Sequence, residues 1–92
     1  NDVINYLYNP NGETKMTNLI NNLKVNDTII LNGREYTVDA EATQATHCVM
    51  VGIKGKRGTD MVLCWYPAQN SGKFFSFTAM SRAKAITSLE LK

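Results

Sequence analysis

The sequence predicts a single, mainly β (α+β) domain: a small barrel of five or six antiparallel strands, with one short N-terminal helix and a helical turn before the last strand. Three observations lead to this fold. Residues 46–67 contain two apolar segments around a glycine-flanked turn, residues 28–38 alternate around Asn32-Gly33, and further short strand-like segments follow to residue 91. A chain of 92 residues is long enough for one hydrophobic core.

The first 24 residues are expected to form a helical extension, and residues 25–92 the barrel. The apolar residues of the extension recur at the spacing of one helical face, as Met16, Leu19, Ile20 and Leu23. They predict an amphipathic helix from Thr14 to Leu23, with Thr14 as its N-cap. The sequence leaves open whether residues 1–8 are helical, extended or disordered, and a turn signal follows them at residues 9–12.

Residues 28–38 form the clearest hairpin. Asn32-Gly33 accepts positive φ at both central positions of a type I′ turn. In the resulting register Ile29 lies opposite Tyr36. The buried face of this hairpin is shared by Leu31, Tyr36 and Val38. The small and polar residues 39–45 are expected to be an irregular connection to the next strand.

Residues 46–67 predict a longer hairpin whose strands are apolar on both faces. With a turn at Gly55–Gly58, the expected pairs are Lys54 with Thr59, Val51 with Val62, and Val49 with Cys64. This register places Cys64 on the face of Val49, and Trp65 on the other face with Gly52. A glycine inside a strand, as at Gly52, indicates a bulge or a sharp bend.

Four short segments complete the expected barrel. In order, they are a loop over residues 67–73, a strand over 74–78, one helical turn over 79–84 and a closing strand over 86–91.

This order of elements resembles the SH3-like and Sm-like barrels. The C-terminal part also resembles the end of WYL regulatory domains, through Gly72-Lys73-Phe74-Phe75-Ser76-Phe77, Ser81-Arg82-Ala83 and Ile86-Thr87-Ser88-Leu89-Glu90-Leu91. The Trp-Tyr-Leu signature of that family is replaced here by Trp65-Tyr66-Pro67. The resemblances imply a fold only, because small barrels carry many unrelated functions.

The charges are unevenly distributed along the chain. The net charge of +2 is too small to indicate a nucleic-acid binder by itself. Residues 1–45, however, carry three basic and six acidic side chains (net −3), and residues 46–92 carry seven basic and two acidic ones (net +5). If the fold gathers the later loops, one surface is basic; the other interpretation is an ordinary mixed surface.

The basic turn Gly55-Lys56-Arg57-Gly58 is the strongest candidate site. Its glycines allow the backbone to approach a phosphate, and rings near strand ends, including Phe74, can stack on bases. The candidate nucleic-acid-binding residues are Lys54, Lys56, Arg57, Lys73, Arg82, Lys84, Trp65, Tyr66 and Phe75. The alternative interpretation is that the rings belong to the core and the lysines keep the turn soluble and prevent edge-to-edge pairing.

The sequence does not favour catalysis, a metal or a small-molecule cofactor. One histidine and two cysteines sixteen positions apart lack the spacing of a zinc site. The expected register places His47 and Cys64 diagonally on one face, which is the one geometry that could form a thiolate–imidazole pair. A shift of one residue would separate them. We therefore expect a protein that is not an enzyme.

The second hypothesis is a small protein-binding adaptor or inhibitor, of the accessory or viral type, that docks on a larger protein through an edge strand or an apolar patch. Some of Met50, Met61, Trp65 and Tyr66 would then be exposed. The expected partner is nucleic acid, either DNA or RNA, or a larger protein, and no membrane. Cysteines within strands and no recognisable signal peptide favour a cytoplasmic location.

Overall fold

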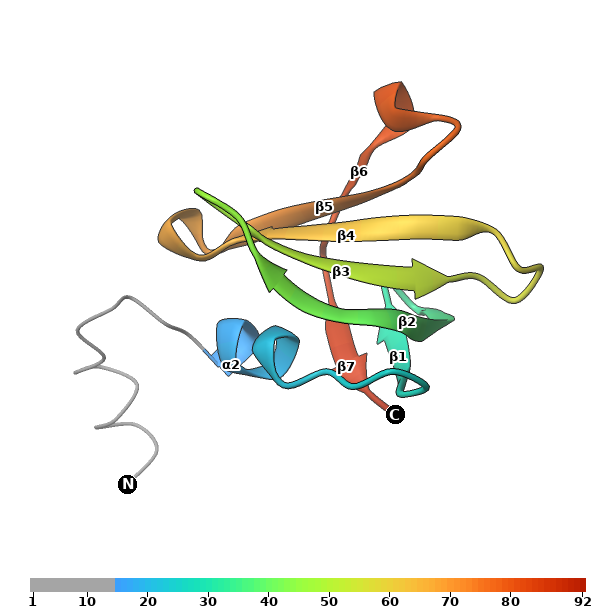
Figure 1. Ribbon diagram of the computed structural model, residues 1–92, viewed down its shortest axis with the longest axis horizontal. Coiled ribbons are helices and arrows are strands. Elements are labelled where there is room, and N and C mark those ends of the chain that lie inside the picture. The colour runs from blue at the N-terminus through green and yellow to red at the C-terminus, as the bar shows by residue number, and fades with distance from the viewer. Residues whose placement is uncertain (1–14) are drawn as a thin grey trace.

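Seven antiparallel strands form one sheet that curls into a half-barrel in the computed structural model, which describes residues 15–92 (Figure 1). The strands are β1 (Thr28–Leu31), β2 (Arg34–Gln44), β3 (Val49–Lys54), β4 (Asp60–Tyr66), β5 (Ser71–Ser76), β6 (Lys84–Ala85) and β7 (Leu89–Leu91). Their order across the sheet is β6-β5-β4-β3-β2-β1-β7. The predictions for residues 1–14, including the Thr14 cap, lie outside the described residues.

The mainly β class is confirmed, but the sheet has seven strands where five or six were expected, and it is a half-barrel. The additional strand is β6, in which Lys84 and Ala85 pair with Phe74 and Lys73 of β5. This two-residue strand exists because the chain returns along β5 after a 3₁₀ turn, η2 (Met80–Arg82). No alternation marks so short a strand in the sequence.

The helix α2 (Lys15–Asn21) packs where β2 ends and β3 begins, and its apolar face enters the core. The amphipathic spacing therefore predicted the helix correctly within the described residues. Ile20 and the following Leu23 are buried beside Val49 and Trp65. The Trp65 indole Nε1–H donates a buried hydrogen bond of 2.9 Å to Thr17 Oγ1, so the helix is joined to β4 by a polar contact as well.

The β1–β2 hairpin has the predicted turn and register. Asn32 and Gly33 have φ values of +52° and +83°, as a type I′ turn requires, and Ile29 lies opposite Tyr36. The expected connection over residues 39–45 is wrong, because β2 continues to Gln44. Polar side chains on its exposed positions concealed this part of the strand.

The β2–β3 ladder bends sharply at the position that the glycine indicated. Two register shifts, between Val38 and Ala40 and between Ala40 and Thr43, give β2 extra residues opposite β3. The irregularity expected at Gly52 is present, but the extra residues belong to the partner strand. A Cβ on Gly52 would lie 3.0 Å from the Ala40 Cβ, so the close approach of the bent strand favours glycine here.

The β3–β4 register differs from the expected one by one residue. Lys54 pairs with Asp60, and Val49 with Trp65. The turn holds five residues, 55–59, because Lys54–Asp60 is the last pair of the ladder; within the turn the Gly55 N–H donates to the Thr59 carbonyl at 3.1 Å. A shift of one residue exchanges the faces of a strand, so Trp65 is in the core and Cys64 is on the outer face.

The core lies on the concave side of the sheet, and every strand except β6 contributes to it. Its buried apolar residues are Ile20, Leu23, Ile29, Leu31, Val38, Val49, Val51, Ile53, Leu63, Trp65, Phe74 and Leu89. The register with Trp65 inside buries a larger apolar side chain in the core than the register with Cys64 inside, which explains why the packing selects it.

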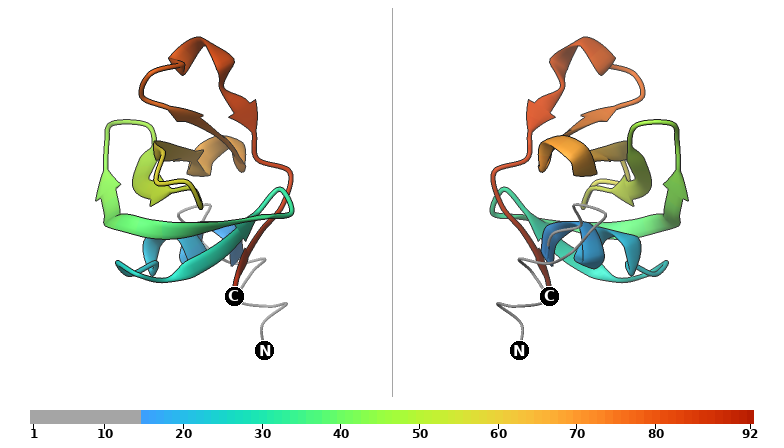
Figure 2. Two further views of the ribbon diagram at one scale, coloured as in Figure 1. Left: turned by 90° about the vertical axis from the view of Figure 1, so that its right-hand side faces the viewer. Right: turned by 90° about the vertical axis from the view of Figure 1, so that its left-hand side faces the viewer.

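The two edges of the sheet are joined by the chain segment 86–88, which crosses from β6 to β7 (Figure 2). The Asn32 side chain holds this segment: its Nδ2 donates to the Ala85 carbonyl at 2.9 Å, and its Oδ1 accepts from the backbone N–H groups of Thr87 at 2.7 Å and Ser88 at 3.2 Å. Asn32, in the β1–β2 turn, thus holds the two edges of the sheet together. We call this junction at residues 86–88 the seam of the half-barrel.

Candidate functional site

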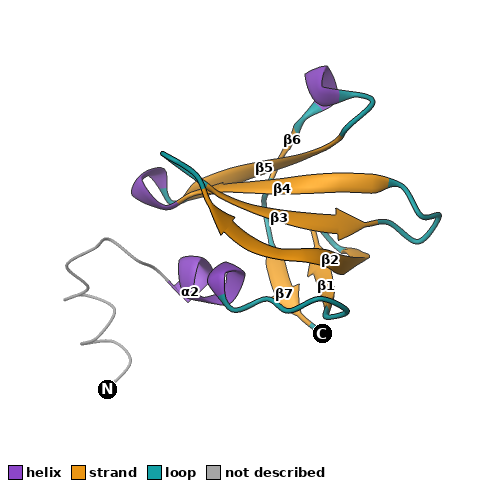
Figure 3. Ribbon diagram, in the orientation of Figure 1, coloured by secondary structure: helices purple, strands orange, loops and turns teal. Residues whose placement is uncertain are grey.

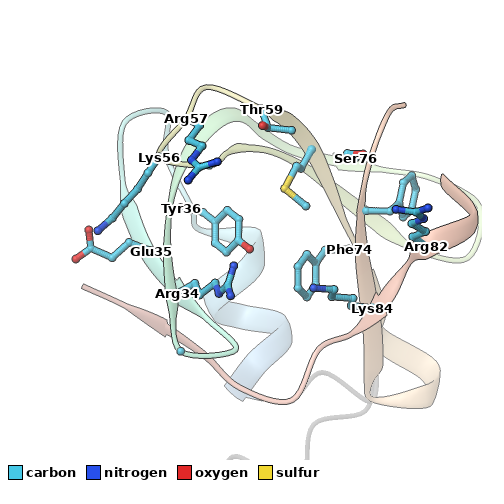
Figure 4. A pocket seen from close by; sticks show the side chains of 14 residues that line it. Arg34, Glu35, Tyr36, Lys56, Arg57, Thr59, Phe74, Ser76, Arg82 and Lys84 are labelled. Carbon is cyan, nitrogen blue, oxygen red and sulfur yellow. The ribbon is translucent and has the colours of Figure 1, made fainter. Parts of the chain in front are cut away.

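A cavity of about 720 Å³ occupies the end of the half-barrel opposite α2, and five cationic side chains line it (Figure 4). We call it the open-end cavity. Its cations are Arg34, Lys56, Arg57, Arg82 and Lys84. The same end carries the loop of the β3–β4 turn, whereas the 3₁₀ turn η1 (Pro67–Gln69) lies at the other end of β4 (Figure 3).

The five cations come from three segments that are far apart in the sequence. Arg34 is the first residue of β2 and shares the inward face with Tyr36. Lys56 and Arg57 are exposed on the β3–β4 turn, which Gly58 closes with a φ of +81°. Arg82 and Lys84 follow from η2 and β6. The curl of the sheet brings these segments together around one cavity.

Two aromatic rings form the floor of the open-end cavity. Tyr36 of β2 and Phe74 of β5 meet edge to face, with ring centroids 6.0 Å apart and an interplanar angle of 67°. Phe74 is only 3% exposed and seals the core, whereas Tyr36 is half-buried. Figure 4 shows the Tyr36 hydroxyl directed towards the middle of the cavity, with Arg34 and Lys84 beside the rings.

One carboxylate, Glu35, is among the lining residues, and it is neutralised from outside the cavity. It forms an ion pair with Lys92, in which the Lys92 Nζ–H donates to the Glu35 carboxylate. That hydrogen bond, the charge of Lys92 and the more distant charge of Lys56 lower the pKa of Glu35 from its ordinary value. The cations of the cavity therefore keep an excess of positive charge at neutral pH.

No cavity cation forms an ion pair with another residue of the described range 15–92. Within residues 15–92 the ion pairs are Lys92–Glu35 and Lys54–Asp60, the second at 3.6 Å between partly exposed side chains. Lys56 and Arg57 are thus available to an anionic ligand. Both residues are exposed, as a basic turn that contacts a ligand must be.

The structure brings together some of the nine predicted site residues and separates the others. Those that line the open-end cavity are Lys56, Arg57, Arg82, Lys84 and Phe75. Lys54 is paired with Asp60. Tyr66 does not line the cavity: it lies on the outer face together with Lys73, whose Nζ is 5.9 Å from the centroid of the Tyr66 ring. Trp65 is a core residue, 4% exposed, so its ring is not presented to a ligand.

Sequence reasoning missed Arg34 and Tyr36 and assigned Phe74 only as a neighbouring ring. A signal was present for the first two. In the correctly predicted hairpin, Arg34 falls on the same face as Tyr36 and Val38, which is the face that points inward. A charged residue at the end of an inward-facing row indicates that the row reaches solvent there, as at the mouth of a barrel.

The outer face of the sheet carries the cysteines. Cys64 is buried, and its pKa is raised first by burial and then by the neighbouring Cys48, against a smaller opposite effect of Lys73. His47 is exposed in the loop before β3. The one-residue change of register thus removes the His47–Cys64 geometry on which a thiolate–imidazole pair depended.

Residues 15–92 contain no group of three or more His, Cys, Asp or Glu side chains arranged to hold a metal ion. Their helices are too short and too polar to cross a membrane.

Comparison of the chain with protein-family models, with curated proteins and with solved structures finds no match. The geometry and charge of the open-end cavity are therefore the basis for inferring a function.

Proposed function

We propose that this protein binds nucleic acid, without catalysis, through the open-end cavity. One observation carries the proposal: Arg34, Lys56, Arg57, Arg82 and Lys84 surround a partly exposed tyrosine in a single cavity. Several cations around one site match a ligand with several regularly spaced negative charges, which is what a phosphate backbone presents. Guanidinium groups also bind phosphate through two parallel hydrogen bonds.

The proposal refines the site that the sequence indicated. The β3–β4 turn remains part of it, but the turn is one rim of a cavity and not an isolated projection. Lys54 and Lys73 are assigned to its surroundings, because one is paired with Asp60 and the other lies over Tyr66 on the outer face. The aromatic contribution comes from Tyr36, since Trp65 is buried.

The fold assignment that accompanies this function is an SH3-like or Sm-like barrel. A long bent strand, β2, and a 3₁₀ turn shortly before the last strands support it. The resemblance of residues 72–91 to the end of WYL domains is a second proposal of the same kind. Neither assignment supports the function, because these barrels bind many ligands.

The alternative is an adaptor or inhibitor that docks on a larger protein. The large apolar side chains exposed in residues 15–92 are Val25, Met50, Phe77, Met80 and Leu91. Only Phe77 and Met80 are close in the sequence, and the others come from separate elements. The cationic cavity is the better defined site, so we favour nucleic acid and keep a protein partner as the alternative.

Charge reversal at the cavity tests the proposal. We expect the double variant Lys56→Glu/Arg57→Glu to lose affinity for a mixed-sequence RNA or DNA by about 100-fold at low salt, since two phosphate contacts become repulsive. The matched control is Lys15→Glu/Lys24→Glu, which changes the net charge equally at exposed residues of α2 and the following loop. Fluorescence anisotropy measures binding, and circular dichroism checks the fold.

Salt dependence supplies the second measurement. With four or five phosphate contacts, the logarithm of the affinity of the wild type falls against the logarithm of the salt concentration with a slope of about −3 to −4. The cavity variant should show a slope shallower by about 2, and the control variant an unchanged slope. Equal losses in both variants would refute the open-end cavity as the binding site. No binding at low salt would refute nucleic-acid binding and favour the protein-binding alternative.

A further inference from the structure

The open-end cavity differs from a flat basic surface in that its aromatic floor lies inside a ring of cations. Tyr36 is half-buried at the level of Phe74, while Lys56 and Arg57 are exposed on one rim and Arg82 and Lys84 on another. Figure 4 shows the rims on opposite sides of the ring pair. A ligand that reaches Tyr36 must therefore enter the cavity between charged rims.

Duplex nucleic acid cannot make this contact. In a double helix the faces of the bases are stacked on one another, and a protein reaches only their edges in the grooves. The face of a base becomes available where the nucleotide is unpaired, and aromatic side chains then stack on it. The ring of Tyr36, at the bottom of a cavity, is complementary to an unpaired base and not to a helix.

The size of the cavity agrees with a single inserted nucleotide. Its volume of about 720 Å³ falls within the range of roughly 300–1,000 Å³ that is typical of sites for small organic molecules. With one nucleotide inserted, the cations on the two rims lie next to the phosphates that precede and follow its base. Arg34, beside Tyr36 on the inward face of β2, is placed to contact either the base or a phosphate.

We infer that the open-end cavity takes one unpaired nucleotide of a single strand, with its base against Tyr36 and its flanking phosphates on the two cationic rims. This inference rests on the proposed nucleic-acid function and adds the structural class of the ligand. It assigns Tyr36 to the recognition of an unpaired base and the rim cations to the recognition of phosphate. It predicts a preference for single strands that charge alone does not produce.

The test compares one oligonucleotide sequence as a single strand and as a duplex at the same low salt concentration. We expect the wild type to bind the single strand at least 10-fold more tightly. Tyr36→Leu should reduce binding to the single strand by about 5- to 100-fold, the effect of losing one stacked base. Its weaker binding to the duplex should not change, because the rim cations remain.

Two controls separate recognition from folding. Tyr66→Leu removes a tyrosine on the outer face, beside Lys73, and should leave both affinities unchanged. A single strand carrying abasic sites is a probe that requires no protein variant: it keeps the phosphates, lacks bases, and should bind the wild type about 10-fold more weakly than the intact strand. It keeps the inference testable if Tyr36→Leu does not fold.

The possible results separate two claims: that the cavity takes an unpaired nucleotide, and that the protein binds nucleic acid. Equal affinity for single strand and duplex, together with equal affinity for the abasic strand, would overturn the inference while nucleic-acid binding stands. Tighter binding to the duplex would do the same. Failure to bind any of the three probes would overturn both.

Discussion

At one end of the half-barrel the side chains of α2 fill the space between the strands, whereas at the other end that space is a cavity lined by cations. The same strands build both ends. Trp65 and Val49, at the filled end, are 4% and 1% exposed, and an indole hydrogen bond to Thr17 completes the packing. At the open end Tyr36 is half-buried, and Arg34 continues the inward-facing row of β2.

This difference shows that one end of a small sheet can provide stability while the other end is available for ligand recognition. Apolar side chains that face inward are stabilising only where another element covers them, and α2 provides that cover at one end. No element within residues 15–92 covers the opposite end. Inward-facing positions there carry charged or amphipathic side chains. Because residues at the open end contribute less to the core, they can change in favour of a ligand with a smaller loss of stability.

The largest expected effect contrasts the two ends directly. Trp65→Ala should lower the free energy of unfolding by about 3–5 kcal/mol, because it leaves a cavity under α2 and removes the bond to Thr17. Tyr36→Leu should cost about 1 kcal/mol, mainly through the lost edge-to-face contact with Phe74. Urea denaturation followed by circular dichroism measures both values.

If Trp65→Ala is unfolded even without urea, its cost exceeds the whole free energy of unfolding, which already distinguishes it from Tyr36→Leu. Trp65→Phe, with an expected cost of about 1–2 kcal/mol, then measures only the loss of the indole hydrogen bond and of part of the ring. Similar costs of Trp65→Ala and Tyr36→Leu would contradict the division described above. Such a result would show that the open end contributes as much to the free energy of unfolding as the filled end.

The seam, where Asn32 holds residues 86–88 and joins the two edges of the sheet, gives an intermediate effect. Asn32→Gly keeps the positive φ of the turn but removes the side chain that holds residues 86–88, so it should cost about 1–3 kcal/mol. Asn26 is a matched control, because it has a φ of +78° and makes none of these bonds across the seam. Asn26→Gly should change the free energy of unfolding by only a few tenths of a kcal/mol.

Thermal or urea denaturation measures this pair of variants, and hydrogen exchange at β6 and β7 locates the change. An equal effect of both substitutions would mean that the cost comes from the added backbone freedom of glycine and that the side-chain bonds of Asn32 contribute nothing. In that case the chain segment that joins the two edges of the sheet would be held by other contacts.

The smallest expected effect concerns the Glu35–Lys92 pair at the rim of the open end. Because Lys92 lowers the pKa of Glu35 in the folded protein, the pair contributes to stability above the pKa of the unfolded chain, and this contribution disappears as the pH falls through the lower folded-state pKa. The pair faces solvent, so the contribution is small. Lys92→Ala should return the pKa of Glu35 towards its ordinary value, as measured by NMR titration.

In the same variant the melting temperature at neutral pH should hardly change, but the affinity for nucleic acid should decrease slightly, because an uncompensated carboxylate then lines the cavity. An unchanged titration of Glu35 would show that the ion pair does not persist in solution. The contrast between the filled end and the open end would still hold, but the Glu35–Lys92 pair would play no part in it.

Local signals predicted the elements more accurately than their pairing. The β1–β2 turn requires only that two adjacent residues accept positive φ, and Asn32-Gly33 was sufficient to predict it. The β3–β4 turn contains two glycines and is compatible with loops of four or five residues, so its length was ambiguous. The packing of Trp65 against Val49 and α2 resolved the register, and neither contact is visible along the chain.

The sequence alone determined the mainly β class, the helix face, the β1–β2 register and the exposure of the cationic turn, because each depends on periodicity or on neighbouring residues. Only the tertiary structure decided which face of β4 is buried, how Asn32 fastens the seam, and which charges share a cavity. Arg34, Arg57 and Lys84 are far apart along the chain and meet because the sheet curls. That curvature follows from extra residues in β2 and from the packing of all the strands together, which no single segment encodes.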